Sequence, residues 1–260
     1  AMLGAAAFVG TLTGGMFFAF LLISGLANAL CTCLALIDED LWWVSLETVI
    51  ALLVASHYAS GLDAALHRTA VICLAGIFQM ACVLTLDRLL PKSHPRPVLN
   101  IPIPATRRAL TVYGLVAAAS VMGATVVATG LHLDKAYWAP MTALIVLKPK
   151  YQLTKQRGFE RLVGNVAGCA AATGLTFVLP SLGWLDLVLC VMGAGCAYAL
   201  LKARYAAFSL AVSFTAVMLL YMAHTPALHG AEQRVYATLL GGLIAIVVMW
   251  IASKTVARDF

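Results

Sequence analysis

Long apolar runs without any alternation of polar and apolar residues constrain the fold of this chain most. The run Gly241–Ile251 contains no charged residue. A lipid-facing backbone must satisfy its hydrogen bonds within its own segment, as helices do, whereas barrel strands alternate in polarity. Apolar residues make up 62% of the 260 residues and charged residues 11%, against about 25% charged in soluble domains. The sequence therefore predicts an all-α polytopic membrane bundle and excludes a soluble enzyme, a disordered chain and a nucleic-acid-binding protein.

Glycines, prolines and charges divide the apolar runs into about ten expected transmembrane helices. The expected spans are 3–20, 22–37, 41–57, 66–88, 107–130, 136–149, 160–179, 183–201, 204–223 and 233–252. Residues 91–106 contain five prolines and no helical period, which is typical of an extended linker. We therefore expect a partial first bundle over 1–90, a proline-rich cytoplasmic linker over 91–106 and a six-helix unit over 107–260.

The orientation follows from the basic connections between the spans. The net charge is +6, and most of the 17 Lys and Arg residues lie around 87–108, 148–161, 202–204 and 254–258. With ten spans, all four places fall on one side of the membrane, which the positive-inside rule makes the cytoplasmic side. Both termini are therefore expected in the cytoplasm.

A short motif recurs where three of the helices are expected to begin. Residues 161–168 read R-x3-N-x2-G, residues 234–241 read R-x3-T-x2-G, and residues 10–14 repeat the G-[N/T]-x2-G core. Arg68, with Gly76 eight residues further on, is a looser match. The residues singled out by the motif are Arg161, Gly164, Asn165, Gly168, Arg234, Thr238, Gly241, Gly10, Gly14 and Arg68.

The segment before each arginine also recurs. Tyr137-Trp138 opens the span before Arg161, Tyr205 opens the span before Arg234, and Trp42-Trp43 opens the span before Arg68. Residues 107–179 and 183–252 therefore read as two three-helix units, and an odd number of spans inverts the second unit. Inverted repeats of this kind place the substrate site of transporters at the repeat interface. The first four spans are expected to match the last four.

Two interpretations of the motif residues stand side by side. In the functional one, the arginines offer a planar donor fork to a carboxylate, and Asn165 and Thr238 hydrogen-bond a ligand one turn further inside. In the structural one, the arginines are interfacial anchors and the glycines only let helices approach closely. The recurrence of the whole motif favours the functional interpretation.

The span 136–149 is unusually short for a membrane-crossing helix. Its 14 residues would reach about 21 Å, against about 30 Å of hydrocarbon, and Pro140 and Pro149 interrupt it. Short, proline-broken segments are a pointer to a substrate site. The alternative is a longer helix that runs to about Leu153, with Tyr137 and Trp138 as ordinary interfacial aromatics.

The stretch 137–168 resembles the signature of the fusaric acid resistance (FUSC) family, which includes aromatic acid exporters of bacterial inner membranes. The resemblance covers roughly 107–252 as one unit and 3–88 as a partial second. Asn165 stands where the family usually has Thr, and only the short linker stands where many exporters carry a soluble domain. The matching motif residues are Tyr137, Trp138, Thr142, Arg161, Gly164, Asn165 and Gly168.

The resemblance implies an efflux permease or transporter for small organic anions, with aromatic carboxylates as the favoured class. We expect Arg161, Arg234 and Arg68 to bind the anion, and Glu47 is the candidate for proton coupling because intramembrane carboxylates are rare. The alternatives are an anion channel and a non-transporting scaffold that binds a partner or lipid.

No enzyme, cofactor or metal site is expected, since no catalytic motif appears and no His or Asp lies at ligand spacing from the cysteines. The expected partners are a small organic anion and the lipid bilayer, and not nucleic acid. A second copy of the chain and a periplasmic adaptor subunit are the protein partners to test. The expected location is the bacterial inner membrane.

Overall fold

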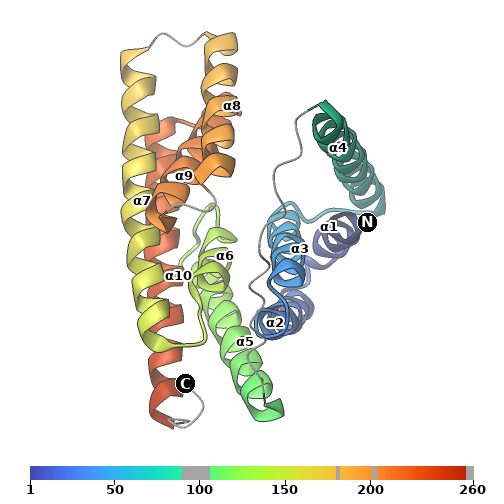
Figure 1. Ribbon diagram of the computed structural model, residues 1–260, viewed down its shortest axis with the longest axis vertical. Coiled ribbons are helices and arrows are strands. Elements are labelled where there is room, and N and C mark those ends of the chain that lie inside the picture. The colour runs from blue at the N-terminus through green and yellow to red at the C-terminus, as the bar shows by residue number, and fades with distance from the viewer. Residues whose placement is uncertain (90–105, 180–181, 201–203, 256–260) are drawn as a thin grey trace. The chain divides into compact units, whose positions relative to one another are not determined.

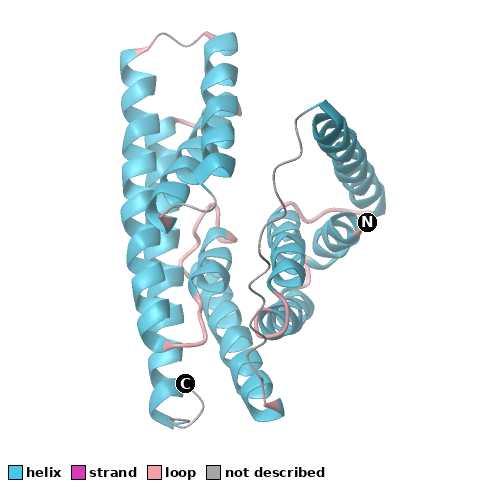
Figure 2. Cartoon of the chain, in the orientation of Figure 1, coloured by secondary structure: helices cyan, strands magenta, loops and turns pink. Residues whose placement is uncertain are grey.

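The computed structural model describes residues 1–89, 106–179, 182–200 and 204–255. Within these ranges the chain forms ten α-helices and no strand (Figure 2). In chain order they are α1 (Met2–Thr13), α2 (Phe17–Leu34), α3 (Glu39–His57), α4 (Leu62–Leu89), α5 (Arg107–Gly130), α6 (Trp138–Val146), α7 (Tyr151–Val178), α8 (Gly183–Leu200), α9 (Tyr205–Met222) and α10 (Ala227–Thr255). The predicted all-α fold is confirmed. The predicted linker 91–106 lies outside the described residues, apart from Thr106.

The helices have the lengths and composition of a membrane bundle. Among the described helices, α2, α4, α5, α7, α8, α9 and α10 are long and apolar enough to cross a bilayer. Helix α1 and the stretch Leu41–His57 of α3 are apolar but shorter. Large apolar side chains such as Phe177 and Phe78 are more than 70% exposed, as expected of faces that meet lipid rather than water. The chain is a helical membrane protein.

Several helices begin or end away from the predicted boundaries. Helix α5 has the predicted bounds, but the predicted span 3–20 is divided between α1 and α2 around Gly14-Gly15. Helix α7 begins at Tyr151, nine residues earlier than predicted, and α10 begins at Ala227, six residues earlier. A prediction from hydropathy places the end of a span where charged residues begin. The backbone hydrogen bonds of α7 and α10 nevertheless extend into these charged turns, so the helices are longer than their apolar spans.

The chain divides into two compact units, Ala1–Ala118 and Ala119–Phe260, with the division inside α5. In the first unit, α1 packs against α3 and α4, and α2 packs against α3. In the second, α7 packs against α9 and α10, and α8 packs against α9 (Figure 1). The same three pairings therefore recur in α1–α4 and α7–α10, as the match between the first and last four spans predicts. The predicted domain limits at 90 and 107 stay a prediction.

The second unit also contains a reciprocal pairing between its two three-helix segments. Helix α10 packs against α6, and α7 packs against α9, so the last helix of each segment lies against the middle helix of the other. Helices α7 and α10 lie side by side and run in opposite directions (Figure 1). This exchange brings the two copies of the arginine motif, one on α7 and one on α10, to a shared interface.

The motif glycines lie where these helices come closest. A Cβ on Gly164 or Gly168 of α7 would overlap a backbone carbonyl oxygen of α9, from Ala206 and Leu210 respectively. A Cβ on Gly241 of α10 would overlap the carbonyl oxygen of Ala139 in α6. Gly10 of α1 and Gly14, the residue after α1, stand in the same relation to the Leu52 and Ser56 carbonyls of α3. Glycine is needed here because any side chain would push the two backbones apart.

Candidate functional site

Helix α6 is a short, almost fully buried element that ends well before α7 begins. It has nine residues, and Leu147 and Lys150 after it have extended backbones, with ψ of 128° and 137°. The Thr154 hydroxyl fixes this break, because it accepts from the Lys148 N–H at 2.9 Å and donates to the Lys148 carbonyl at 3.0 Å. The alternative of one longer helix to about Leu153 is therefore wrong, and the segment is a broken one.

The early start of α7 places its motif residues in the interior of the helix. Arg161 is the eleventh and Asn165 the fifteenth of 28 residues, so Asn165 lies at the middle of α7. Arg234 lies seven residues after Ala227, the first residue of the 29-residue α10. The expectation that these arginines stand where their helices begin is wrong. The structure places both guanidinium groups in the interior of the bundle.

Arg161 and Arg234 are both buried, with 5% and 4% of their surface exposed. Arg161 Nη1 donates a hydrogen bond to the Tyr205 hydroxyl at 2.9 Å. The Arg234 guanidinium carbon lies 5.1 Å from the centre of the Trp138 ring. Trp138 and Tyr205 are the first residues of α6 and α9, so each motif arginine meets the aromatic residue that opens the partner segment's middle helix.

Asn165 connects the two copies of the motif. Its side-chain amide donates to the Arg234 carbonyl at 3.2 Å and to the Thr238 hydroxyl. The Cys169 thiol lies 3.6 Å from the Asn165 amide oxygen, and both residues are buried. The polar positions one turn beyond each arginine therefore bond to each other across the α7–α10 interface. In the described structure they hold the helices together rather than stand free.

The positive charge of this cluster is not balanced by a carboxylate in the described part of the chain. The electrostatic neighbours of Arg234 are Arg161, which repels it, and Cys169, Tyr137 and Tyr205. The Nε atoms of Arg161 and Arg234 are buried without a hydrogen-bond partner among the described residues. Leaving a buried charge unpaired costs several kcal/mol, so a cluster of this kind is typical of a site that takes up an anion.

Tyr137, which immediately precedes α6, and Thr142 of α6 lie beside this cluster. The Tyr137 ring meets the Trp138 ring edge to face, with 5.7 Å between their centres. Thr142 is 1% exposed and lies against Gly241, where a Cβ would come within 3.0 Å of the Thr142 Cβ. Tyr137 thus packs against Trp138, whereas Thr142 packs against Gly241 of α10.

Arg68 belongs to the first unit and has partners of its own there. It donates to the Thr11 hydroxyl at 2.6 Å and to the Tyr58 carbonyl at 3.0 Å. With Asp63 and His67 it lines an open cavity of about 500 Å³. The predicted role of Arg68 in binding stays a prediction.

Glu47 lies on α3 with its side chain on the exposed face of the first unit. Its predicted role in proton coupling stays a prediction.

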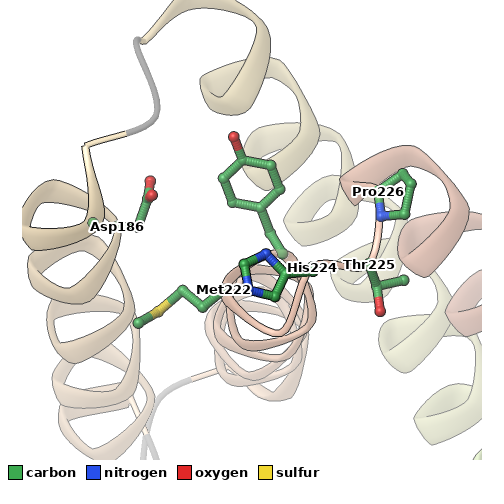
Figure 3. A pocket seen from close by; sticks show the side chains of 7 residues that line it. Asp186, Met222, His224, Thr225 and Pro226 are labelled. Atoms are coloured by element: carbon green, nitrogen blue, oxygen red, sulfur yellow. The ribbon is translucent and has the colours of Figure 1, made fainter.

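A second open cavity, of about 520 Å³, lies between the first turn of α8 and the connection from α9 to α10. Figure 3 shows Asp186 and His224 on opposite walls of this cavity. None of the predicted site residues lines it.

Two residues of the cluster were missed as site residues in the sequence. The Arg157 guanidinium carbon lies 3.5 Å from the centre of the Tyr205 ring, and its Nε is buried without a described partner. In the sequence, Arg157 was interpreted only as one of the basic residues that set the membrane topology. Tyr205 was interpreted only as the residue that opens a span. The four-residue spacing from Arg157 to Arg161 to Asn165 was the available signal, because it places all three on one face of a helix.

Comparisons with known proteins place the chain in a family. A profile of the "Fusaric acid resistance protein-like" family matches residues 109–248, which include both copies of the arginine motif in the second unit. The chain is 33% identical over 148 residues to "Uncharacterized protein YhfK" of Escherichia coli (strain K12), covering 56% of the chain and 20% of the relative. It is 25% identical over 150 residues to "Uncharacterized protein ORF2" of Neisseria gonorrhoeae, covering 58% and 34%.

A further relative is "Inner membrane protein YccS" of Escherichia coli (strain K12), which is 30% identical over 132 residues, covering 51% of the chain and 17% of the relative. The chain thus matches about a third or less of the length of each of these curated relatives. No solved structure matches it.

Proposed function

Because the chain belongs to the fusaric acid resistance protein-like family, we propose that it is a transporter of small organic anions, with aromatic carboxylates as the favoured class. The observation that carries this proposal is the pair of buried arginines, Arg161 and Arg234, without a carboxylate partner in the described part of the chain. A carboxylate would supply the missing counter-charge, and the planar fork of Arg matches its two oxygens.

The surrounding side chains favour a ligand with an aromatic body. Trp138 and Tyr205 each contact one of the two arginines, and Tyr137 lies against Trp138. Aromatic rings prefer offset or edge-to-face contacts with other rings, which an aliphatic acid cannot make. A benzoate-like ligand would therefore place its carboxylate at the guanidinium groups and its ring against these aromatic side chains.

The proposal also includes the location of the transporter, its coupling residue and its partners. We place the chain in a bacterial inner membrane, the location that the printed name of its relative YccS gives for that protein. Both termini are proposed to lie in the cytoplasm because the basic connections predict it. Glu47 is proposed to couple transport to protons, and Arg68 to bind an anion in the first unit. The proposed protein partners are a second copy of the chain and a periplasmic adaptor subunit.

The test is efflux of benzoate from liposomes that contain the purified chain. We expect Arg161→Gln to abolish efflux, whereas Lys155→Gln, which removes an exposed cation from the same helix, leaves it unchanged. Undiminished efflux by Arg161→Gln would refute the assignment. Currents that reverse at the Nernst potential of benzoate would show a channel instead. A chain that moves no anion but co-purifies with a fixed partner would show a scaffold.

A further inference from the structure

The side of the arginine pair that faces the start of α7 is closed by Tyr205. The Tyr205 ring is 8% exposed and lies between two arginines of α7. Arg157 stacks on the ring, with 3.5 Å between the guanidinium carbon and the ring centre. Arg161 holds the hydroxyl by a 2.9 Å hydrogen bond. One side chain of α9 thus separates Arg157 from the deeper pair.

Exposure to solvent decreases from Arg157 to the Arg161–Arg234 pair. Arg157 is half-buried, and Arg161 and Arg234 are buried. Arg157 and Arg161 are four residues apart on α7, which corresponds to about 6 Å along the axis and to the same face. Since all three arginines have a buried Nε without a described partner, each has a donor to offer to an anion.

We propose that Arg157 is an entry subsite for the carboxylate and that Tyr205 is the gate between it and the Arg161–Arg234 site. This inference rests on the proposed function of that site. A carboxylate that arrives from the Tyr151 end of α7 meets Arg157 first and competes with the Tyr205 ring for its guanidinium. It then replaces the Tyr205 hydroxyl on Arg161, and the ring moves aside.

The gate makes an unusual prediction for Tyr205→Phe. If the hydroxyl competes with the anion for Arg161, its removal tightens benzoate binding about ten- to a hundredfold, because the anion no longer has to displace a hydrogen bond to a charged group. If the hydroxyl were itself a ligand of the anion, the same variant would bind more weakly. Tyr236→Phe is the matched control, because Tyr236 lies on α10 and is 61% exposed.

The entry subsite makes a kinetic prediction for Arg157→Gln. Charges at the rim of a site act mainly on the association rate, whereas buried charge pairs act mainly on dissociation. We expect about a tenfold slower association of benzoate and a dissociation rate within about threefold of the wild type. Arg157→Lys keeps the charge and should restore association, and Lys155→Gln should leave both rates unchanged.

The experiment is stopped-flow measurement of the intrinsic tryptophan fluorescence of the full chain in detergent, to which Trp138 beside Arg234 contributes, and calorimetric titration with benzoate. The inference is overturned if Arg157→Gln behaves like Lys155→Gln, if its effect lies in dissociation, or if Tyr205→Phe weakens binding. If the wild type does not bind benzoate, or Arg161→Gln binds it equally well, the proposed function fails as well. The two failures are thereby distinguished.

Discussion

Replacing Arg234 by Met should stabilise the protein while it abolishes anion binding. Arg234 is 4% exposed, it is repelled by Arg161, and its Nε has no partner among the described residues. Its guanidinium contacts the Trp138 ring, with 5.1 Å between the guanidinium carbon and the ring centre. Met keeps much of the volume of the aliphatic stem and removes the charge, so little packing is lost.

The expected gain is about 2 kcal/mol. A buried charge without a partner costs about 3 kcal/mol, and the lost cation–π contact with Trp138 subtracts about 1 kcal/mol. A change of 1 kcal/mol moves the Tm of a chain of this size by about 2–4 °C, so we expect a rise of about 4–8 °C. Benzoate at a hundred times its Kd should stabilise the wild type by about 2.7 kcal/mol and Arg234→Met not at all.

The assay is thermal unfolding of the full chain in one detergent, with and without benzoate. Lys155→Met is the control, because it removes an exposed cation from α7 and should keep both the Tm and its response to benzoate. A lower Tm for Arg234→Met would mean that the charge has a partner that stabilises it. A full benzoate response in that variant would mean that the anion binds elsewhere, and either result refutes the reasoning.

Two further predictions concern the helix interface. Gly168→Ala should lower the Tm by several degrees, since the added Cβ overlaps the Leu210 carbonyl oxygen and overpacking costs about 1–3 kcal/mol. Gly174→Ala on the same helix meets open space and should raise the Tm slightly. Equal shifts in Tm for the two variants would contradict the close approach of α7 and α9. Asn165→Ala should lower the free energy of unfolding by about 1–3 kcal/mol, because it removes the amide that bonds the Thr238 hydroxyl and the Arg234 carbonyl. Asn165→Thr should recover part of this loss. Equal Tm values for the two variants would argue against a stabilising role of these hydrogen bonds.

The sequence pattern predicted the interface of the second unit well and its helix ends poorly. The R-x3-[N/T]-x2-G motif anticipated that α7 and α10 carry equivalent residues, and the structure joins them through Asn165 and Thr238. The start of α7 was missed because its first ten residues include several charges, which end a hydropathy span without ending a helix.

The contact between Tyr205 and Arg161 could not be predicted from local sequence patterns. Tyr205 and Arg161 are 44 residues apart, and their contact depends on how α9 packs against α7. The glycines of α7 set that packing by allowing the two backbones to approach, but a small-x3-small pattern does not name the partner helix. Only the tertiary arrangement shows that an aromatic residue from the opposite segment separates Arg157 from the deeper pair.

The most direct test of an anion site at the two motif arginines is a crystal structure of the chain grown with 4-iodobenzoate. The anomalous signal of the iodine would locate the ring, and the density would locate the carboxylate. We predict carboxylate oxygens at about 2.7–2.9 Å from the guanidinium nitrogens of both Arg161 and Arg234, with the Tyr205 hydroxyl displaced from Arg161. An iodine peak elsewhere, with the Arg161–Tyr205 hydrogen bond intact and no density between the arginines, would contradict the account.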